Sequence, residues 1–385
     1  MRASALVAHG GGPTSVLNAS LMGVIEAARA AGLKHLWAPR GGLAGVFRGD
    51  LADLLAAPER YVERLAAQSG SAIGSFRGKV EDFGAVIDFF CAREIRHFFY
   101  TGGNGSMSTA QKIAAEARAR GYELATIGIP KTIDNDICET DHCPGFGSAA
   151  RFAATAVREI GLDQRALPTP VSIVELMGRD TGWLAAAAIL AQRAPDDAPH
   201  FIYVPEAPFD AEEFLGRIDD LLRRQGWVIG VVAEGLRDGE GKIIAETRGS
   251  SRDAKGRPLA GDVAAHLARL VSRKLRVRAR SEKPGLLCRA FAPCQSPVDA
   301  AEARGAGQFA VRSAMEGQPG AMVALCRARS GRYSCTFTLV PLSRVADRER
   351  LLPAKYIRGP GEIRDSYRAY VAPLIGPALD AAVWF

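Results

Sequence analysis

The sequence predicts an α/β protein with parallel β-sheets. Short apolar runs typical of buried strands alternate with longer amphipathic segments typical of helices, and this alternation is the pattern of βαβ units. Several of the apolar runs pass directly into glycine-rich turns, which is common where a helix follows closely behind a strand. With 385 residues, the chain is long enough for two domains of ordinary size.

In the first half of the chain, three expected strands are each followed by a helix. Each strand is a short apolar run, and each helix repeats apolar residues at helical spacing. The strands are expected at residues 6–8, 95–100 and 125–129, and the helices at 16–31, 107–119 and 147–160.

The second half of the chain continues the alternation. Strands are expected at residues 171–176, 201–204 and 228–233, with a helix at 181–191 between the first two. Asp210 has the position of a helix cap, and Glu213 follows three residues later at the spacing of a capping box. Residues 237–261 are polar and rich in glycine and basic residues, so we interpret them as an insertion or mobile loop.

The composition is that of a soluble globular protein, with 48% hydrophobic and 24% charged residues. No apolar run approaches the length of about 18 residues that a membrane-spanning helix needs. The N-terminus lacks the apolar core and cleavage site of a signal peptide. The seven cysteines are an odd number without a C-x-x-C pair, which favours free thiols in a reducing cytoplasm. We therefore expect a cytoplasmic protein with no membrane partner.

The net charge of +7 and the pI of about 9.1 favour anionic partners. The one basic cluster, residues 273–280, alternates basic with apolar residues near its end, as a helix running into a strand would. No aromatic residues interleave this cluster for base stacking. We therefore expect phosphorylated metabolites as partners and no nucleic acid.

The most informative segment is Pro-Lys-Thr-Ile-Asp-Asn-Asp at residues 130–136, directly after an expected strand. Ligands of open α/β sheets bind just outside the carboxyl ends of the strands. Two carboxylates at such a place can divide the chemistry, one accepting a proton and the other holding a metal ion. Asp134 and Asp136 are the candidates, and the adjacent Lys131 suits a phosphate. The alternative is an Asx-rich turn, because Asp and Asn are common turn formers.

Three strand-to-helix turns, at residues 10–14, 102–106 and 178–182, are rich in glycine. Glycine lets the backbone approach a ligand closely, and the helix start behind it aims N–H groups at an anion. None of the turns matches G-x-x-x-x-G-K-[ST] or a clean G-x-G-x-x-G, so neither a P-loop enzyme nor a dinucleotide-dependent dehydrogenase is favoured. Arg77 adds a cation beside a further glycine turn, where ordinary surface charge is the alternative.

Together, Gly-Gly-x-Gly-Ser at 102–106, Pro-Lys-Thr-Ile-Asp-Asn-Asp at 130–136 and Met-Gly-Arg at 177–179 resemble the motifs of the 6-phosphofructokinase family. The resemblance extends from Gly10 to about Arg289. It implies two Rossmann-like parallel-sheet α/β domains of the phosphofructokinase fold. A phosphoryl-donor domain would comprise residues 1–145 with roughly 290–345 returning, and a sugar-phosphate domain residues 146–289 with roughly 346–385.

The resemblance also implies an activity, the transfer of a phosphoryl group to the 1-hydroxyl of fructose 6-phosphate in glycolysis. Asp134 resembles the base that takes the hydroxyl proton, and Asn104 and Asp136 resemble ligands of Mg²⁺. The residues expected at the phosphoryl donor are Gly12, Arg77, Gly103, Asn104, Gly105, Ser106 and Lys131. Those expected at the sugar phosphate are Thr132, Asp134, Met177, Gly178, Arg179, Glu234, Arg280 and Arg289.

Two positions bear on whether the donor is ATP or pyrophosphate. An acidic residue in place of Gly105 would fill the space of a nucleotide's α-phosphate, so glycine favours ATP. Lys131 favours pyrophosphate, because pyrophosphate-dependent members carry lysine where many ATP-dependent members carry glycine. We predict ATP, since an absent carboxylate block is the stronger constraint. A reversible pyrophosphate-dependent phosphotransferase is the alternative.

The chain departs from the family pattern at two further positions. Many members have aspartate where this chain has Asn104, and an amide is a weaker ligand for magnesium. The histidine that often lies three residues before the 6-phosphate arginine is replaced by Leu286. Both departures resemble the pyrophosphate-using branch.

Two other functional classes compete with this interpretation. A non-catalytic regulatory subunit that binds sugar phosphates is disfavoured, because Asp134, Asp136 and Arg179 are all present. A lipid or NAD kinase is disfavoured, because those enzymes lack the motifs at 130–136 and 177–179. Since family members are usually dimers or tetramers, we expect a homodimer or homotetramer.

Overall fold

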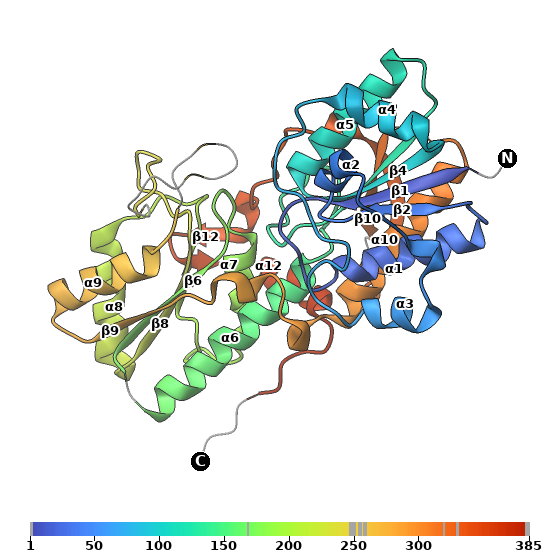
Figure 1. Ribbon diagram of the computed structural model, residues 1–385. Coiled ribbons are helices and arrows are strands. Elements are labelled where there is room, and N and C mark those ends of the chain that lie inside the picture. The colour runs from blue at the N-terminus through green and yellow to red at the C-terminus, as the bar shows by residue number, and fades with distance from the viewer. Residues whose placement is uncertain are drawn as a thin grey trace. The chain divides into compact units, whose positions relative to one another are not determined.

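The computed structural model describes residues 3–167, 169–245, 252, 256, 260–318, 320–328 and 331–381. The chain forms two compact units, each built from two stretches of sequence (Figure 1). Unit 1 comprises Met1–Ser148 and Arg289–Arg350, and unit 2 comprises Ala149–Cys288 and Leu351–Phe385. The chain therefore passes from one unit to the other three times.

Among the described residues, unit 1 contains a seven-stranded sheet in the order β11-β10-β5-β4-β1-β2-β3. The five inner strands are parallel to one another, whereas the edge strands β3 and β11 are antiparallel to their neighbours. The strands are β1 Ser4–His9, β2 Leu36–Pro39, β3 Leu51–Asp53, β4 Ile95–Gly102, β5 Ala125–Pro130, β10 Ala321–Arg327 and β11 Cys335–Pro341.

Helices cover both faces of this sheet, so its central strands are apolar on both sides. Side chains alternate between the faces along β1. Ala5 and Val7 pack in the core beneath α1 and α10, while Leu6 and Ala8 pack in the core beneath α4 and α5 (Figure 1). The helices of unit 1 are α1 Leu17–Ala30, α2 Ala44–Arg48, α3 Glu59–Leu65, α4 Phe83–Ala92, α5 Asn104–Ala119, α10 Pro297–Met315 and α11 Leu342–Val345, with short 3₁₀ turns at Leu54–Ala56 and Ala292–Cys294.

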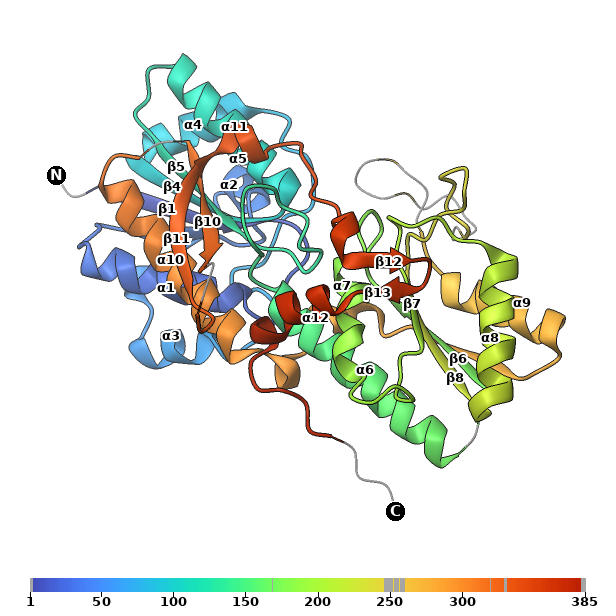
Figure 2. The ribbon, with the colours of Figure 1, turned by 180° about the vertical axis from the view of Figure 1, so that it is seen from behind.

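Unit 2 contains a parallel four-stranded sheet in the order β7-β8-β6-β9. One face packs on α8 and α9. A Cβ added to Gly161 of α6 would lie 4.0 Å from Ile229 Cδ1 of β8. A separate two-stranded ribbon, β12 with β13, lies beside β7, where Ile202 N donates to Gly361 O (Figure 2).

The elements of unit 2 follow the same alternation as those of unit 1. Its strands are β6 Val171–Leu176, β7 Phe201–Tyr203, β8 Val228–Ala233, β9 Ala279–Glu282, β12 Ile357–Gly359 and β13 Glu362–Ile363. Its helices are α7 Trp183–Ala187, α8 Ala211–Gln225, α9 Val263–Leu275 and α12 Asp365–Val371, with 3₁₀ turns at Ala188–Ala191, Gly285–Cys288, Ala354–Tyr356 and Ala372–Ile375. Helix α6, Phe146–Ala166, begins in unit 1 and continues into unit 2.

The α/β prediction with parallel sheets is confirmed, and every strand expected from the sequence is present. Asp210 caps α8 by accepting a hydrogen bond from Glu213 N at 2.8 Å. The helix expected at 181–191 is shorter, because α7 tightens into a 3₁₀ turn after Ala187. Much of the expected insertion at 237–261 lies outside the described residues; its start is a turn in which Asp238 N donates to Lys242 O.

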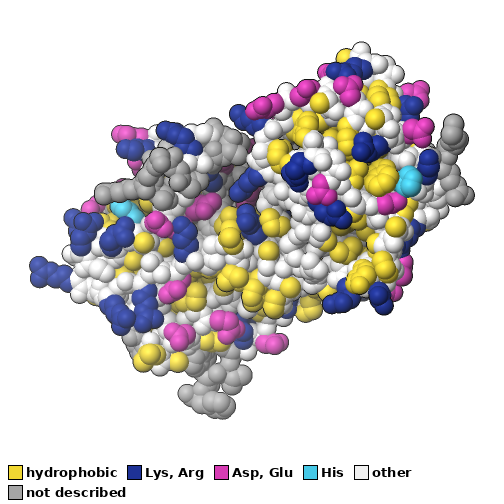
Figure 3. Space-filling view, in the orientation of Figure 1, with side chains coloured by type: hydrophobic (Ala, Val, Ile, Leu, Met, Phe, Trp, Pro, Cys, Tyr) yellow, Lys and Arg dark blue, Asp and Glu magenta, His cyan; other side chains and the backbone are white. Residues whose placement is uncertain are grey.

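Two bulk expectations can be compared with the structure. The cysteines are thiols rather than disulfides. In the described ranges, no helix is both long enough and apolar enough to cross a bilayer. Lys and Arg side chains are scattered over the face drawn in Figure 3 and form no continuous stripe there.

Candidate active site

Two glycine loops of unit 1 meet at the carboxyl ends of β1 and β4. Gly10 N donates to Thr101 O at 2.8 Å. A Cβ added to Gly10 would lie 2.2 Å from Ser106 Oγ, and one added to Gly102 would lie 2.1 Å from it. Side chains cannot approach so closely, so both loops need glycine to pack here. The start of α5 stands at this junction, and a helix start supplies N–H groups for an anion.

Gly105, in the first turn of α5, is exposed. A Cβ at this position would meet no atom within 4 Å, so the space beside the glycine is open. The space that the α-phosphate of ATP would need beside Gly105 is therefore open. An open space permits a nucleotide but offers no contact that would hold one.

Lys131 is buried beside the first glycine loop, with only 3% of its surface exposed. Its Nζ donates to Gly12 O at 2.6 Å. Burial lowers the pKa of Lys131 to about 8; Asp134 opposes this shift, and Arg289 and Arg77 add to it. Lys131 and Gly12, both predicted to bind the phosphoryl donor, are therefore in contact.

The segment that carries Arg77 is tied to the first glycine loop by main-chain hydrogen bonds. Gly11 N donates to Phe76 O at 2.9 Å, and Phe76 N donates to His9 O at 3.0 Å. His9 itself was not predicted: its Nδ1 hydrogen-bonds Ser71 Oγ at 2.8 Å inside the same loop pair. Burial, with a contribution from Lys131, lowers the pKa of His9 to about 3, so this ring is neutral.

Asp134 lies in a turn directly after β5. Its main-chain N–H donates to Thr132 Oγ1 at 3.1 Å, and Thr132 Oγ1 donates to Asp134 Oδ2 at 3.4 Å. Thr132 is itself fixed, because its N–H donates to Pro144 O at 3.2 Å. The threonine therefore orients the carboxylate that we predicted as the base.

Asp136 and Asn104 form the second half of the predicted centre. Asn104 Nδ2 donates to Asp136 Oδ2 at 2.8 Å. The remaining oxygens, Asn104 Oδ1 and Asp136 Oδ1, are buried and have no hydrogen-bond partner among the described residues. Burial, with the Asp134 carboxylate nearby, raises the pKa of Asp136 to about 7. Two unsatisfied oxygens beside two crowded carboxylates fit Mg²⁺, a hard cation that takes oxygen ligands.

A largely buried ionic network lies at residues 141 and 142, shortly after the turn that carries Asp134 and Asp136. The sequence analysis did not predict this network. His142 Nδ1 is 2.8 Å from Asp141 Oδ2, and its Nε2 is 2.7 Å from Glu302 Oε2. Burial alone would lower the pKa of His142, but the two carboxylates raise it above its ordinary value. Cys335 is close enough to complete a set of metal-ligand types. Both ring nitrogens are already satisfied by carboxylates, so the network is complete as a set of hydrogen bonds.

In unit 2, the Met177–Gly178–Arg179 loop lies directly after β6. Gly178 has φ 144°, a conformation that favours glycine. Its N–H is 3.5 Å from Glu234 Oε1, and its carbonyl accepts from Gly235 N at 3.2 Å. A Cβ on Gly235 would lie 1.7 Å from Arg179 O. The structure therefore brings Glu234 close to the loop that we predicted to bind the sugar phosphate.

Glu206 also supports this loop, although no motif identified it. Its Oε1 accepts hydrogen bonds from Gly182 N and from Leu352 N, each at 2.9 Å. Burial raises the pKa of Glu206. A carboxylate that joins two separate chain segments has no local pattern in the sequence.

Arg280 lies away from the Met177–Gly178–Arg179 loop within unit 2, whereas Arg289 lies in unit 1 together with Thr132 and Asp134. Arg280 is exposed on the edge strand β9, in register with Ser172. Met177 follows Ser172 by five residues on the neighbouring strand, a distance of about 16 Å at about 3.3 Å per residue. Arg289 belongs to unit 1 rather than to the predicted second domain. There, a Cβ on Gly12 would lie 2.6 Å from Arg289 Nη1.

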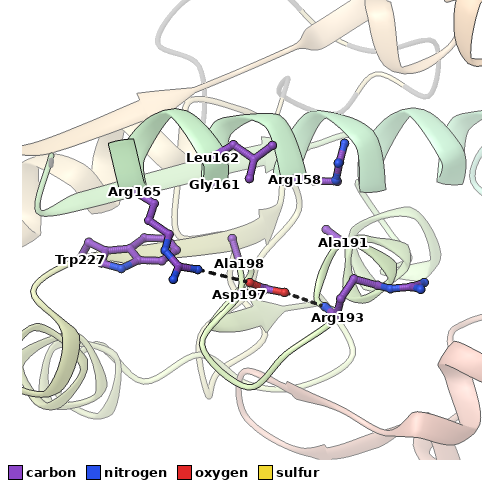
Figure 4. Close-up of a pocket in the computed structure, with 9 residues that line it drawn as sticks. All are labelled: Arg158, Gly161, Leu162, Arg165, Ala191, Arg193, Asp197, Ala198 and Trp227. Carbon is purple, nitrogen blue, oxygen red and sulfur yellow. Dashed lines mark hydrogen bonds and ion pairs between the residues drawn. The ribbon is translucent and has the colours of Figure 1, made fainter. Parts of the chain in front are cut away.

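A separate hollow in unit 2 contains none of the predicted residues. It lies between the end of α6, the 191–198 segment and Trp227 (Figure 4). Arg165 and Asp197 form an ion pair across it at 4.0 Å. Arg158 and Arg193 also line the hollow, but none of the predicted site residues does, so we assign the hollow no role in the site.

Comparison with known proteins identifies the family. The family model described as "Phosphofructokinase" matches residues 4–314. The chain belongs to the phosphofructokinase family. Members of this family are phosphotransferases, so the prediction of a phosphotransferase of the phosphofructokinase fold is confirmed.

Some relatives cover nearly the whole chain, and others cover part of it. A pyrophosphate–fructose 6-phosphate 1-phosphotransferase from Xanthomonas campestris pv. campestris is 39% identical over 381 residues, which span 96% of this chain and 91% of that protein. A solved structure of a pyrophosphate-dependent phosphofructokinase from Marinobacter aquaeolei has a TM-score of 0.89 and 34% identity, covering 99% of this chain and 93% of that one. An ATP-dependent 6-phosphofructokinase from Amycolatopsis methanolica is 34% identical over 229 residues, 58% of this chain and 48% of that protein.

Proposed function

We propose that this phosphofructokinase transfers a phosphoryl group from pyrophosphate to the 1-hydroxyl of fructose 6-phosphate. One observation of the structure carries the choice of donor. The buried Lys131 ammonium lies at the bottom of the glycine loops, 2.6 Å from Gly12 O. A cation in that position can bind a phosphate of a small inorganic donor directly.

This proposal replaces the preference for ATP that Gly105 suggested. Four relatives that match 96–98% of the chain at 34–39% identity are named for pyrophosphate. A sulfofructose kinase matches 96% of it at 32% identity, and ATP-dependent relatives match 58–82% of it at 29–34% identity. The reason that the steric argument was insufficient is physical. Room beside Gly105 removes one obstacle to ATP, but binding needs contacts that offset the loss of freedom on association.

The residues of unit 1 can perform the chemistry without a covalent intermediate. Asp134 takes the proton from the 1-hydroxyl, and the oxygen then attacks a phosphorus of pyrophosphate as inorganic phosphate leaves. Asn104 and Asp136 would hold Mg²⁺, which neutralises negative charge on the donor. Lys131 and Arg77 add positive charge at the donor, and Thr132 orients Asp134. We assign the donor to unit 1 for these reasons.

We assign the sugar phosphate to unit 2, where the loop at Met177–Gly178–Arg179 and Glu234 lie together. Arg280 lies too far along β9 to serve that loop of its own chain. Its exposure at a sheet edge suits a role in a neighbouring copy, which agrees with the expected homodimer or homotetramer. Arginine forks suit the 6-phosphate.

The direct test is to identify the products. Purified protein would be mixed with fructose 6-phosphate, pyrophosphate and Mg²⁺, and the phosphorus species followed by ³¹P NMR. We expect equal amounts of fructose 1,6-bisphosphate and inorganic phosphate. Because the leaving group is itself phosphate, fructose 1,6-bisphosphate with phosphate should also regenerate pyrophosphate. Absence of reaction in both directions would contradict the proposal.

A further inference from the structure

The turn that carries Asp134 and Asp136 is gripped by one arginine from the other end of unit 1, Arg350. Its Nε and Nη2 donate to Asn135 O, at 3.1 and 2.7 Å. Its Nη1 donates to Thr140 O and to Asp141 O, each at 2.6 Å. All the acceptors are main-chain carbonyls of the segment that begins at the catalytic turn.

The backbone around Arg350 adds to this grip. Its main-chain N–H donates to Asp136 O at 2.7 Å, and Glu349 pairs with Ile137 in an isolated β-bridge. Arg350 thus contacts the carbonyls of the two residues that immediately follow Asp134.

Asn135 explains why the turn needs such support. This residue has φ 54°, a left-handed conformation that is uncommon for residues other than glycine. Its side-chain Oδ1 accepts from Cys143 N at 3.0 Å. The conformation places Asp134 and Asp136 on either side of a sharp bend, so a small change at Asn135 would redirect both carboxylates.

Arginine suits this role for a chemical reason. Its planar guanidinium offers five N–H donors in a fixed fork, whereas lysine offers three donors from one rotating ammonium. One fork can therefore satisfy carbonyls of three different residues at once. Carbonyls turned away from a sheet have no strand partner and need such a donor when they are buried.

We propose that Arg350 is a positioning residue for phosphoryl transfer, which fixes the catalytic turn through its carbonyls without touching either substrate. The inference rests on the proposed function, because Asp134 and Asp136 act in that reaction. It goes beyond that function because it assigns the orientation of the catalytic turn to a residue that lies 215 positions after Asn135 in the sequence.

A positioning role and a purely structural role differ in their kinetic consequences. Arg350 holds main-chain carbonyls of residues 135–141, and these carbonyls are not among the groups that we assign to substrate binding. Arg350→Ala should therefore leave the Michaelis constants of both substrates within about threefold. A displacement of about 1 Å at a reacting group can lower the rate by about 100-fold. We therefore expect kcat of Arg350→Ala to fall by about 10- to 100-fold per folded molecule.

The experiment compares Arg350→Ala, Arg350→Lys and the matched control Arg348→Ala, an exposed arginine two residues away. Steady-state kinetics with fructose 6-phosphate and pyrophosphate give kcat and both Michaelis constants, and circular dichroism gives the folded fraction. Added guanidinium ion should partly restore kcat of Arg350→Ala and leave Arg348→Ala unchanged. Arg350→Lys should fold and lie between the wild type and Arg350→Ala in kcat.

Hydrogen exchange separates failure of this inference from failure of the proposed function. Amides of residues 135–143 should exchange faster in both Arg350 variants than in the wild type, whether or not the wild type uses pyrophosphate. Unchanged exchange in that segment, or kcat of the Arg350 variants equal to that of the wild type, would overturn the inference. A wild type that lacks the reaction would contradict the proposed function alone. If Arg350→Ala does not fold, kcat and hydrogen exchange of Arg350→Lys decide whether the inference holds.

Discussion

Asn104 donates to both the main-chain carbonyl and the carboxylate of Asp136, and each of the two residues keeps one buried oxygen without a partner among the described residues. Asn104 Nδ2 donates to Asp136 Oδ2 at 2.8 Å, and Oδ1 of each residue is unsatisfied among the described residues. A carboxylate in place of Asn104 would instead repel Asp136 at this distance. The amide therefore fits this crowded site better than a further carboxylate would, while still offering an oxygen to a cation.

From this pair we predict that Asp136→Asn weakens Mg²⁺ binding. The concentration of Mg²⁺ that gives half-maximal activity should rise by about tenfold or more, by analogy with the effect of removing a residue around a bound metal. Titration with Mn²⁺ as a spectroscopic probe should show the same loss without substrates. The exposed Asp163→Asn is the matched control. Unchanged metal binding in Asp136→Asn would remove Asp136 from the metal site.

We predict that Asp134→Asn lowers kcat by roughly 10²- to 10⁴-fold, the usual contribution of a positioned general base. The Michaelis constants should change much less, because asparagine keeps the size of the side chain and the hydrogen bond from Thr132. Steady-state kinetics on variant protein with wild-type circular dichroism would measure this. Turnover within about twofold of the wild type would exclude Asp134 as the base.

Lys131 predicts a pH dependence of donor binding. Burial lowers its pKa from 10.5 to about 8, so the ammonium is present below about pH 8 and lost above it. The Michaelis constant for pyrophosphate should therefore be flat below about pH 8 and rise above it. Lys131→Met should raise that constant at every pH and abolish the dependence. If the constant stays flat up to pH 10 in the wild type, Lys131 does not bind the donor as an ammonium.

Arg280 predicts a site completed by a second copy of the chain. Arg280→Ala should raise the Michaelis constant for fructose 6-phosphate by about 10- to 100-fold, equivalent to the 1.5–3 kcal/mol of a hydrogen bond to a charged group. At fructose 6-phosphate concentrations well below the raised Michaelis constant, mixing this variant with Asp134→Asn should produce hybrid oligomers that are more active than either variant alone. Arg269→Ala, on the neighbouring helix, is the control. No recovery on mixing, in proteins shown to exchange subunits, would place Arg280 at its own chain's site or at none.

The sequence predicted best where chemistry and local pattern coincide. The strands before the glycine loops are continuous apolar runs, and the loops after them need glycine for close approach, so both were recognised.

Helix α10 was not predicted, because its sequence has little apolar pattern. It packs against α1 through small residues, with a Cβ on Gly307 only 2.2 Å from Ser20 O and one on Gly23 only 2.0 Å from Arg304 O. A helix face built for close contact shows little apolar pattern.

The residues that support the site from distant segments could not be predicted from the sequence, for a different reason. Arg350 and Glu206 act on main-chain groups of distant segments, and a carbonyl or N–H group is the same in every residue. No spacing rule can therefore reveal the pairing. The position of Arg280 relative to Met177 likewise depends on the register of β6 and β9, which the sequence of one strand does not encode.

Substitution of Gly105 should distinguish the use of pyrophosphate from the use of ATP. Gly105→Asp should leave the use of pyrophosphate within about threefold, because a Cβ added at this position meets no atom within 4 Å. Any use of ATP should disappear, since a carboxylate about 4 Å from an α-phosphate repels it by several kcal/mol even at an effective dielectric constant near 20. Loss of pyrophosphate activity in Gly105→Asp would show that the donor extends into the space beside this glycine.

The most direct test of the central claim is steady-state kinetics of the wild-type protein with pyrophosphate and with ATP as donors, at saturating fructose 6-phosphate and equal free Mg²⁺. We predict a kcat/KM for pyrophosphate at least about 100-fold above that for ATP, a difference of about 2.7 kcal/mol in transition-state binding. Equal values, or a preference for ATP, would contradict the account and return the choice of donor to the open space at Gly105.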